Sequence, residues 1–275
     1  MKTIVIATDF SENSREAAKF AFHSVKNPDT QFIFLNAYET PHTNAGGLVS
    51  SSDVLKKASE ENLEKEVAWA RKAFGSSKTI AKRAYFGQLQ SAIKQVKREF
   101  PDMFLVMGST GNNALEEFFV GSTTETIIKA VEVPTFVVPH TFKPTAYKDI
   151  LVAIEDFDAL QEKTKKELVF VSKLLDVKLE LITIQTSQVE MEKVIEGITE
   201  PEVTEFIEGS EVTHEYLIAD NVEQGIWEAA KREKTELLCV VHHTKGLIKD
   251  LFRKSVTSDM VKEDLLPILV LHEVE

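Results

Sequence analysis

The feature that most constrains the fold of this 275-residue chain is a pattern of strands and helices that occurs twice. Apolar runs of strand length alternate with segments whose apolar residues follow helical spacing. In the first half, the expected strands and helices alternate over residues 3–7, 11–25, 31–38, 53–74, 78–86, 89–100, 102–107, 122–131 and 135–138, with a polar loop at 40–52. Such an alternation favours βαβ units and a parallel sheet.

The second half repeats the same order. Its expected strands and helices alternate over residues 149–154, 161–175, 178–184, 189–207, 211–218, 222–234 and 236–241, with a last strand at 268–271. The ends of the two halves align without a gap, because Ser122 and Pro134 correspond to Ser255 and Pro267. The sequence therefore predicts two tandem α/β domains, residues 1–143 and 144–275, each doubly wound with helices on both faces of a parallel sheet.

The charge of the chain is distributed unevenly between the two halves. Residues 1–143 carry 17 Lys and Arg against 16 Asp and Glu, whereas residues 144–275 carry 15 against 28. An acidic half repels nucleic acid and anionic membranes, so we expect neither as a partner. Cys239 is the single cysteine, and no apolar run approaches the roughly 20 residues that span a bilayer. We therefore expect a cytoplasmic protein without an intrachain disulfide.

The candidate chemistry lies in a glycine pattern, Gly108-x2-Gly111-x9-Gly121-Ser122, between an apolar strand and the start of a helix. Glycine lets a backbone approach a ligand closely, and a helix N-terminus offers unpaired N–H groups to phosphate. Two structural explanations compete with a ligand site. Ser122 and Glu125 have the spacing of a capping box, and the first two glycines could serve turns alone.

The ends of the first and fourth strands would flank this glycine pattern. In open α/β sheets, ligands bind beyond the carboxyl ends of the strands, where the strand order reverses. There Asp9 would accept hydrogen bonds from ribose hydroxyls, and Gly108 would keep a side chain out of the ligand's path. The hydroxyls of Ser122, Thr123 and Thr124 would assist the helix N-terminus in holding phosphates.

Two stretches, TDFSE at 8–12 and GSTG to GSTTE across 108–125, resemble the universal stress protein family, and the whole chain is similar to its tandem two-domain form. The glycine spacing is similar to that of the family's ATP-binding branch. The resemblance implies a five-stranded parallel sheet in each domain, ordered 3-2-1-4-5. It also implies ATP, ADP or AMP between strands one and four of the first domain, with Mg²⁺ or Mn²⁺ held mainly by the phosphates.

Carried over residue by residue, the resemblance implies contacts to every part of the nucleotide. The implied residues are Ala7, Thr8 and Asp9 for the base and ribose, Ala37 for adenine, Met107 and Gly108 for the ribose, and Gly111, Gly121, Ser122, Thr123 and Thr124 for the phosphates. Thr123 stands where the family usually has valine. The resemblance further implies an intrachain pseudo-dimer in which the fifth strands of the two domains meet, and it leaves a further homodimer open.

The second half departs from this pattern. Lys254 replaces the last glycine, one of His242 and His243 stands at the position of the first glycine, and Glu155 replaces the aspartate. We therefore expect the second site to be degenerate for ATP. Adjacent residues of a strand point to opposite faces, so the two histidines are not expected to bind one metal ion. Cys239 is expected to be a buried core residue.

Together with the resemblance, these observations predict a nucleotide-dependent sensor or regulator in the stress response. The chain lacks the Gly-Lys-Ser/Thr sequence of a Walker A motif, and no general base accompanies the glycines, so we assign no catalytic residue. Two alternatives stand beside this prediction. One is a slow ATP hydrolase or transferase that uses the same pocket, and the other is a non-catalytic scaffold whose second domain binds another ligand or a partner.

Overall fold

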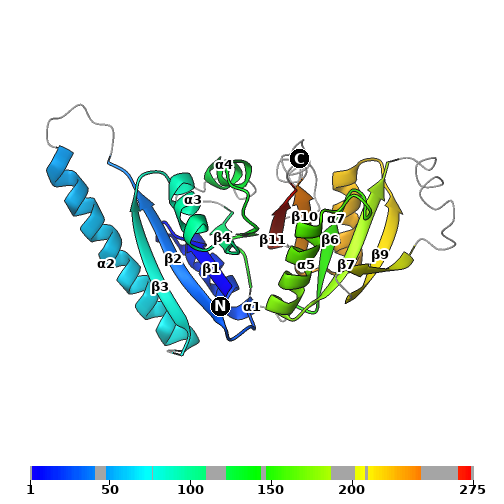
Figure 1. Cartoon of the computed structure of the whole chain (residues 1–275), viewed down its shortest axis with the longest axis horizontal. Helices are drawn as coiled ribbons and strands as arrows, with labels where there is room; N and C mark the ends of the chain where they lie inside the picture. The colour runs from blue at the N-terminus through cyan, green and yellow to red at the C-terminus, as the bar shows by residue number, and fades with distance from the viewer. Residues whose placement is uncertain are drawn as a thin grey trace. The chain divides into compact units, whose positions relative to one another are not determined.

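The computed structural model describes residues 2–40, 48–75, 77–109, 122–143, 147–186, 202–207, 210–242 and 266–273. The chain divides into two compact units, Met1–His140 and Thr141–Glu275 (Figure 1). Each unit contains a mainly parallel sheet with helices between its strands, and the expected class, two tandem doubly wound α/β domains, is confirmed.

The first unit is built around a five-stranded parallel sheet in the order β3-β2-β1-β4-β5. This is the predicted order 3-2-1-4-5. Its elements along the chain are β1 (Lys2–Ala7), α1 (Glu12–Ser24), β2 (Thr30–Tyr38), α2 (Leu48–Phe74), β3 (Thr79–Phe86), α3 (Leu89–Glu99), β4 (Phe104–Gly108), α4 (Ser122–Ala130) and β5 (Thr135–Val138).

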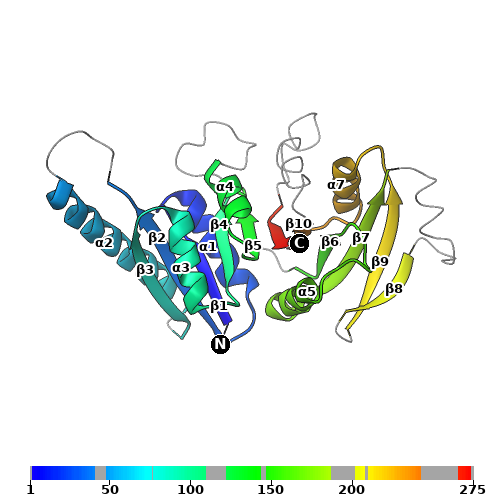
Figure 2. The same cartoon turned by 45° about the horizontal axis from the view of Figure 1, so that its top comes forward.

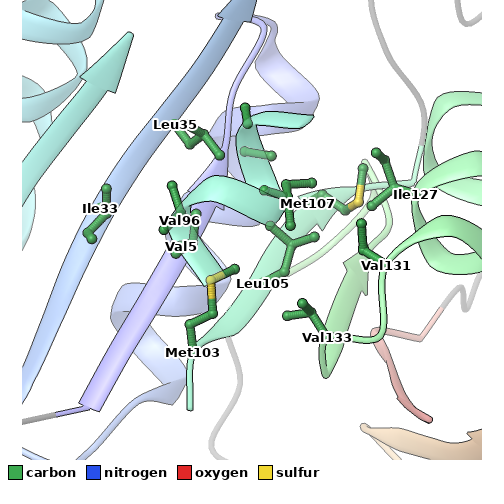
Figure 3. Packing of buried hydrophobic residues seen from close by; sticks show 13 residues of the cluster. Val5, Ile33, Leu35, Val96, Met103, Leu105, Met107, Ile127, Val131 and Val133 are labelled. Atoms are coloured by element: carbon green, nitrogen blue, oxygen red, sulfur yellow. The ribbon is translucent and has the colours of Figure 1, made fainter. Parts of the chain in front are cut away.

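Helices cover both faces of the first sheet. Its central strands therefore carry apolar side chains that are buried on both faces. One face packs against α1, where Phe22 lies 4.4 Å from Phe32 of β2 between ring centroids. The other face packs against α3 and α4 and forms one continuous cluster of apolar side chains. Figure 3 shows this cluster, with Val5 and Leu105 from the strands and Ile127 from α4.

The second unit contains the same five-stranded parallel arrangement, β9-β7-β6-β10-β11, and one further strand, β8, that pairs antiparallel with β9 at the edge (Figure 2). Its described elements are β6 (Asp149–Ala153), α5 (Glu162–Leu175), β7 (Lys178–Gln185), β8 (Glu202–Ile207), β9 (Ser210–Ile218), α7 (Val222–Arg232), β10 (Leu238–His242) and β11 (Ile268–His272).

Two expected element boundaries were wrong. Residues 202–207, the end of the predicted helix over 189–207, form strand β8 instead. Residues 189–201 lie outside the described residues. The segment EVTEFI of β8 is rich in β-branched and aromatic residues, and β9 supplies the strand with which it pairs. In the first unit, α2 begins at Leu48 rather than at 53, so the polar loop at 40–52 is shorter than expected.

Candidate functional site

The ends of β1 and β4 lie side by side in the first unit. The two strands pair through Ile6 and Val106, so the residues that follow each strand emerge at the same edge of the sheet. The backbone N–H of Thr8 donates to Leu35 O at 2.9 Å, and that of Ser109 donates to Val138 O at 2.8 Å. The sheet therefore fixes the backbone of both chain segments where they leave it.

The turn between β1 and α1 presents Asp9 at the surface. Ser11 donates to Asp9 Oδ1 through its backbone N–H, at 3.1 Å, and also through its hydroxyl. Ser11 is also the N-cap of α1, where its Oγ accepts from the N–H of Ser14 at 3.2 Å. Thr8 Oγ1 accepts from the N–H of Phe10, which adopts the left-handed conformation with φ 66°. The carboxylate of Asp9 is thus exposed on a turn that hydrogen bonds hold in place.

Gly108 lies against the start of α1. A Cβ atom at this position would stand 2.7 Å from Nδ2 and 2.8 Å from Cγ of Asn13, which is buried. Real Cβ atoms do not approach other heavy atoms so closely, so any side chain here would displace Asn13. The structure therefore supplies a packing reason for Gly108 besides the expected clearance for a ligand.

The start of α4 lies beside the end of β4. Thr124 is buried, and its Oγ1 donates to the backbone carbonyl of Gly108 at 3.0 Å. Ser122 and Thr123 precede it in the first turn of the helix and are exposed. Ser122 opens α4, and Glu125 lies in the same first turn, at the spacing of a capping box. Of the three side-chain hydroxyls predicted to bind phosphates, those of Ser122 and Thr123 are on exposed residues, and that of Thr124 joins α4 to β4.

Three other predicted site residues contribute their side chains to the core. Ala7 and Met107 belong to the apolar cluster under α3 and α4, and Ala37 packs against it. Figure 3 labels Met107 within this cluster. A ligand at the end of the sheet would meet these residues through their backbone groups. The remaining two predicted residues, Gly111 and Gly121, lie outside the described residues.

Sequence reasoning missed three polar residues that the structure places at this edge of the sheet. Asn13 packs on Gly108, as described above. Asn36, near the end of β2, donates from Nδ2 to the backbone carbonyl of Thr8 at 2.7 Å, and Ser59 of α2 donates to Asn36 Oδ1 at 2.6 Å. The signal for Asn36 was an amide within the otherwise apolar run FIFLNAY, whereas nothing in the sequence marks Ser59.

The second unit has the same strand-end geometry with different side chains. The N–H of Ile154 donates to Ile182 O at 3.0 Å, as Thr8 does to Leu35 in the first unit, and Glu155 follows as an exposed residue. The segment that contains Lys254 lies outside the described residues, as does His243. Cys239 is fully buried in β10, and burial raises the pKa of its thiol. Its expected place in the core is confirmed.

Comparison with known protein sequences finds relatives that match about half of this chain. The sequence model of the universal stress protein family matches residues 1–139. A universal stress protein of Staphylococcus epidermidis is 30% identical over 154 residues, which cover 52% of this chain and 90% of the relative. One from Methanocaldococcus jannaschii is 30% identical over 143 residues, which cover 50% of this chain and 81% of the relative.

The likeness in structure extends over both units. The crystal structure of a universal stress protein from Archaeoglobus fulgidus matches 98% of this chain and 98% of its own, with a TM-score of 0.68 and 16% identity. At that identity the match shows the fold, two tandem α/β domains. Because the family model covers half of the chain, the chain belongs to the universal stress protein family. None of the helices in the described part of the chain is long and apolar enough to cross a membrane.

Proposed function

We propose that the first unit binds ATP, or ADP or AMP, and that the protein acts as a nucleotide-dependent sensor or regulator in the stress response. The proposal rests on one juxtaposition. An exposed carboxylate, Asp9, follows β1, and two exposed hydroxyls, Ser122 and Thr123, open α4, which Thr124 joins to the neighbouring strand β4. A carboxylate suits ribose hydroxyls, and a helix N-terminus with hydroxyl groups suits phosphates.

The donor set also suits a divalent cation that accompanies the phosphates. Mg²⁺ prefers oxygen ligands and keeps several waters, so it is commonly bound through substrate phosphates and one or two carboxylates. The oxygen ligands that the site offers are the exposed carboxylate of Asp9 and the hydroxyls of Ser122 and Thr123. Mg²⁺ or Mn²⁺ would therefore be held mainly by the nucleotide, and we expect ATP to bind more tightly when either ion is present.

The test is direct binding. The purified chain is heated, any released nucleotide is identified by mass spectrometry, and ATP is then titrated calorimetrically with and without Mg²⁺. The variant Ser122→Ala should weaken ATP binding roughly ten- to hundredfold, because a hydrogen bond to a charged group contributes about 1.5–3 kcal/mol. Ser255→Ala, at the aligned position of the second half, is the matched control and should leave the affinity unchanged.

Three outcomes would contradict the proposal. A wild-type chain that releases no nucleotide and binds none in titration would remove its basis. Equal affinities of the Ser122→Ala variant and the wild-type protein would refute the assignment of the phosphate site, as would normal binding by a Gly121→Asp variant. Recovery of ATP intact after long incubation with Mg²⁺ supports a regulator, whereas turnover that disappears in Asp9→Ala supports the hydrolase alternative.

A further inference from the structure

A buried chain of hydrogen bonds runs from helix α2 to the end of β1. Ser59 Oγ donates to Asn36 Oδ1 at 2.6 Å, and Asn36 Nδ2 donates to the backbone carbonyl of Thr8 at 2.7 Å. All three residues are buried. The orientation of the Asn36 amide follows from its partners, because a backbone carbonyl can only accept and must face the NH2 group. The hydroxyl of Ser59 then satisfies the amide oxygen.

This chain of bonds acts on the peptide that precedes Asp9. A peptide unit is planar, so holding the carbonyl of Thr8 also fixes the direction of the N–H of Asp9. The next residue, Phe10, has a positive φ, a conformation that a bulky side chain adopts only where its surroundings determine it. The amide of Asn36 therefore fixes the first peptide of the turn that carries the exposed carboxylate.

The second unit provides an internal comparison. Leu35 and Ile182 are equivalent, since each accepts from the residue that follows the first strand of its unit, and the next residues are Asn36 and Thr183. The hydroxyl of Thr183 bonds to His214 Nε2 on β9 at 2.9 Å. In the first unit, helix α2 connects β2 and β3. In the second unit, the described part of the equivalent connection, between β7 and β9, is strand β8. The fold thus forms with a different side-chain bond at the position of Asn36.

We propose that Asn36 is a positioning residue for the nucleotide site and that Ser59 couples this site to helix α2. The inference rests on the proposed function, because the affected turn carries Asp9. The coupling is reciprocal: loss of the Ser59 bond weakens nucleotide binding, and bound nucleotide protects α2 from hydrogen exchange. Val54 and Lys56, on the turn of α2 that precedes Ser59, are exposed, so a change that nucleotide binding makes in α2 would reach the surface of the domain.

The test compares two buried bonds between the same kinds of groups. Ser59→Ala removes the hydroxyl that binds the amide of Asn36. Thr3→Val removes the hydroxyl that accepts from Gln31 Nε2 at 2.7 Å, a bond between β1 and β2 at the opposite ends of the same strands. We expect Ser59→Ala to weaken ATP binding by roughly five- to tenfold, from the loss of about one hydrogen bond. Thr3→Val should change the affinity less than about twofold, and Ser59→Thr should retain it.

A second measurement does not depend on a ligand. In the nucleotide-free protein, Ser59→Ala should accelerate hydrogen exchange at the N–H of Phe10 relative to wild type, and Thr3→Val should not. Equal affinities of Ser59→Ala and Thr3→Val, or equal exchange at Phe10 in the two variants, would overturn the positioning role. A wild-type chain without ATP affinity would overturn the proposed function, and the exchange rates would then show separately whether Asn36 orders the turn.

Discussion

The contact between Gly108 and Asn13 allows a quantitative test of why a glycine ends β4. In Gly108→Ala, the new Cβ would lie 2.7–2.8 Å from the side chain of Asn13, where an ordinary contact needs about 3.5–4 Å. The atoms that the new Cβ would meet form the end of the Asn13 side chain, which is buried in the first turn of α1. Overpacking of this kind costs about 1–3 kcal/mol. We therefore expect Gly108→Ala to lower the Tm of the first unit by roughly 3–10 °C.

A double-mutant cycle checks this cause. Asn13→Ala removes all three atoms that the new Cβ would meet. Urea unfolding of the wild-type protein, the two single variants and the double variant should show that Gly108→Ala costs less than about 0.5 kcal/mol once Asn13 is alanine. The same cost in both backgrounds would refute the packing explanation. If a glycine were needed at this position only for a ligand, Gly108→Ala would weaken ATP binding and leave the free energy of unfolding unchanged.

Two further predictions concern buried ionisable groups. Burial lowers the pKa of His214 to about 4, from about 6.5 in the unfolded chain. The unfolded state therefore binds more protons between these values, and the second unit should lose up to about 3 kcal/mol as the pH falls from about 6.5 to 4. Urea unfolding at pH 7 and pH 4.5 should show that His214→Gln removes this loss, and an unchanged slope would contradict the assignment. In the first unit, Arg15 binds the buried carboxylate of Glu66 through Nε and Nη2. The side chain of Arg15 is 44% exposed, so solvent screens part of the pair, and Arg15→Met should cost about 1–2 kcal/mol. Arg15→Met with Glu66→Leu should recover most of this cost; a double variant as unstable as the single one would disprove the pairing argument.

The order of the elements could be predicted from the sequence because its signal is local. Apolar runs such as TIVIA at 3–7 and FLVM at 104–107 are buried on both faces, as strands of a parallel sheet are. In the helices between these strands, apolar residues recur about every three or four positions, which is also a local pattern. The pairing of β1 with β4, which brings Asp9 and Gly108 to the same edge of the sheet, does not follow from that order alone; it was expected from the resemblance to the universal stress protein family.

Strand β8 could not be predicted in the same way. Pro201 directly precedes its segment EVTEFI and marks a break in the helical pattern, but the strand form depends on pairing with β9. A partner strand is a tertiary feature, which local propensity does not contain. The start of α2 was also not predicted, because the helix begins at Leu48 and the expected helix began at 53.

Hydrophobic periodicity and glycine spacing are local patterns, so the fold class, the two repeats, the element order and the strand ends of the candidate site could be inferred from neighbouring residues. The contacts of each residue at those strand ends could be known only from the packed fold. In the packed fold, Asn13 lies against Gly108, and Thr124 donates to the carbonyl of Gly108. Ser59 donates to Asn36, which donates to the carbonyl of Thr8. These contacts join residues far apart in the chain, so they exist only after the sheet and its helices have packed.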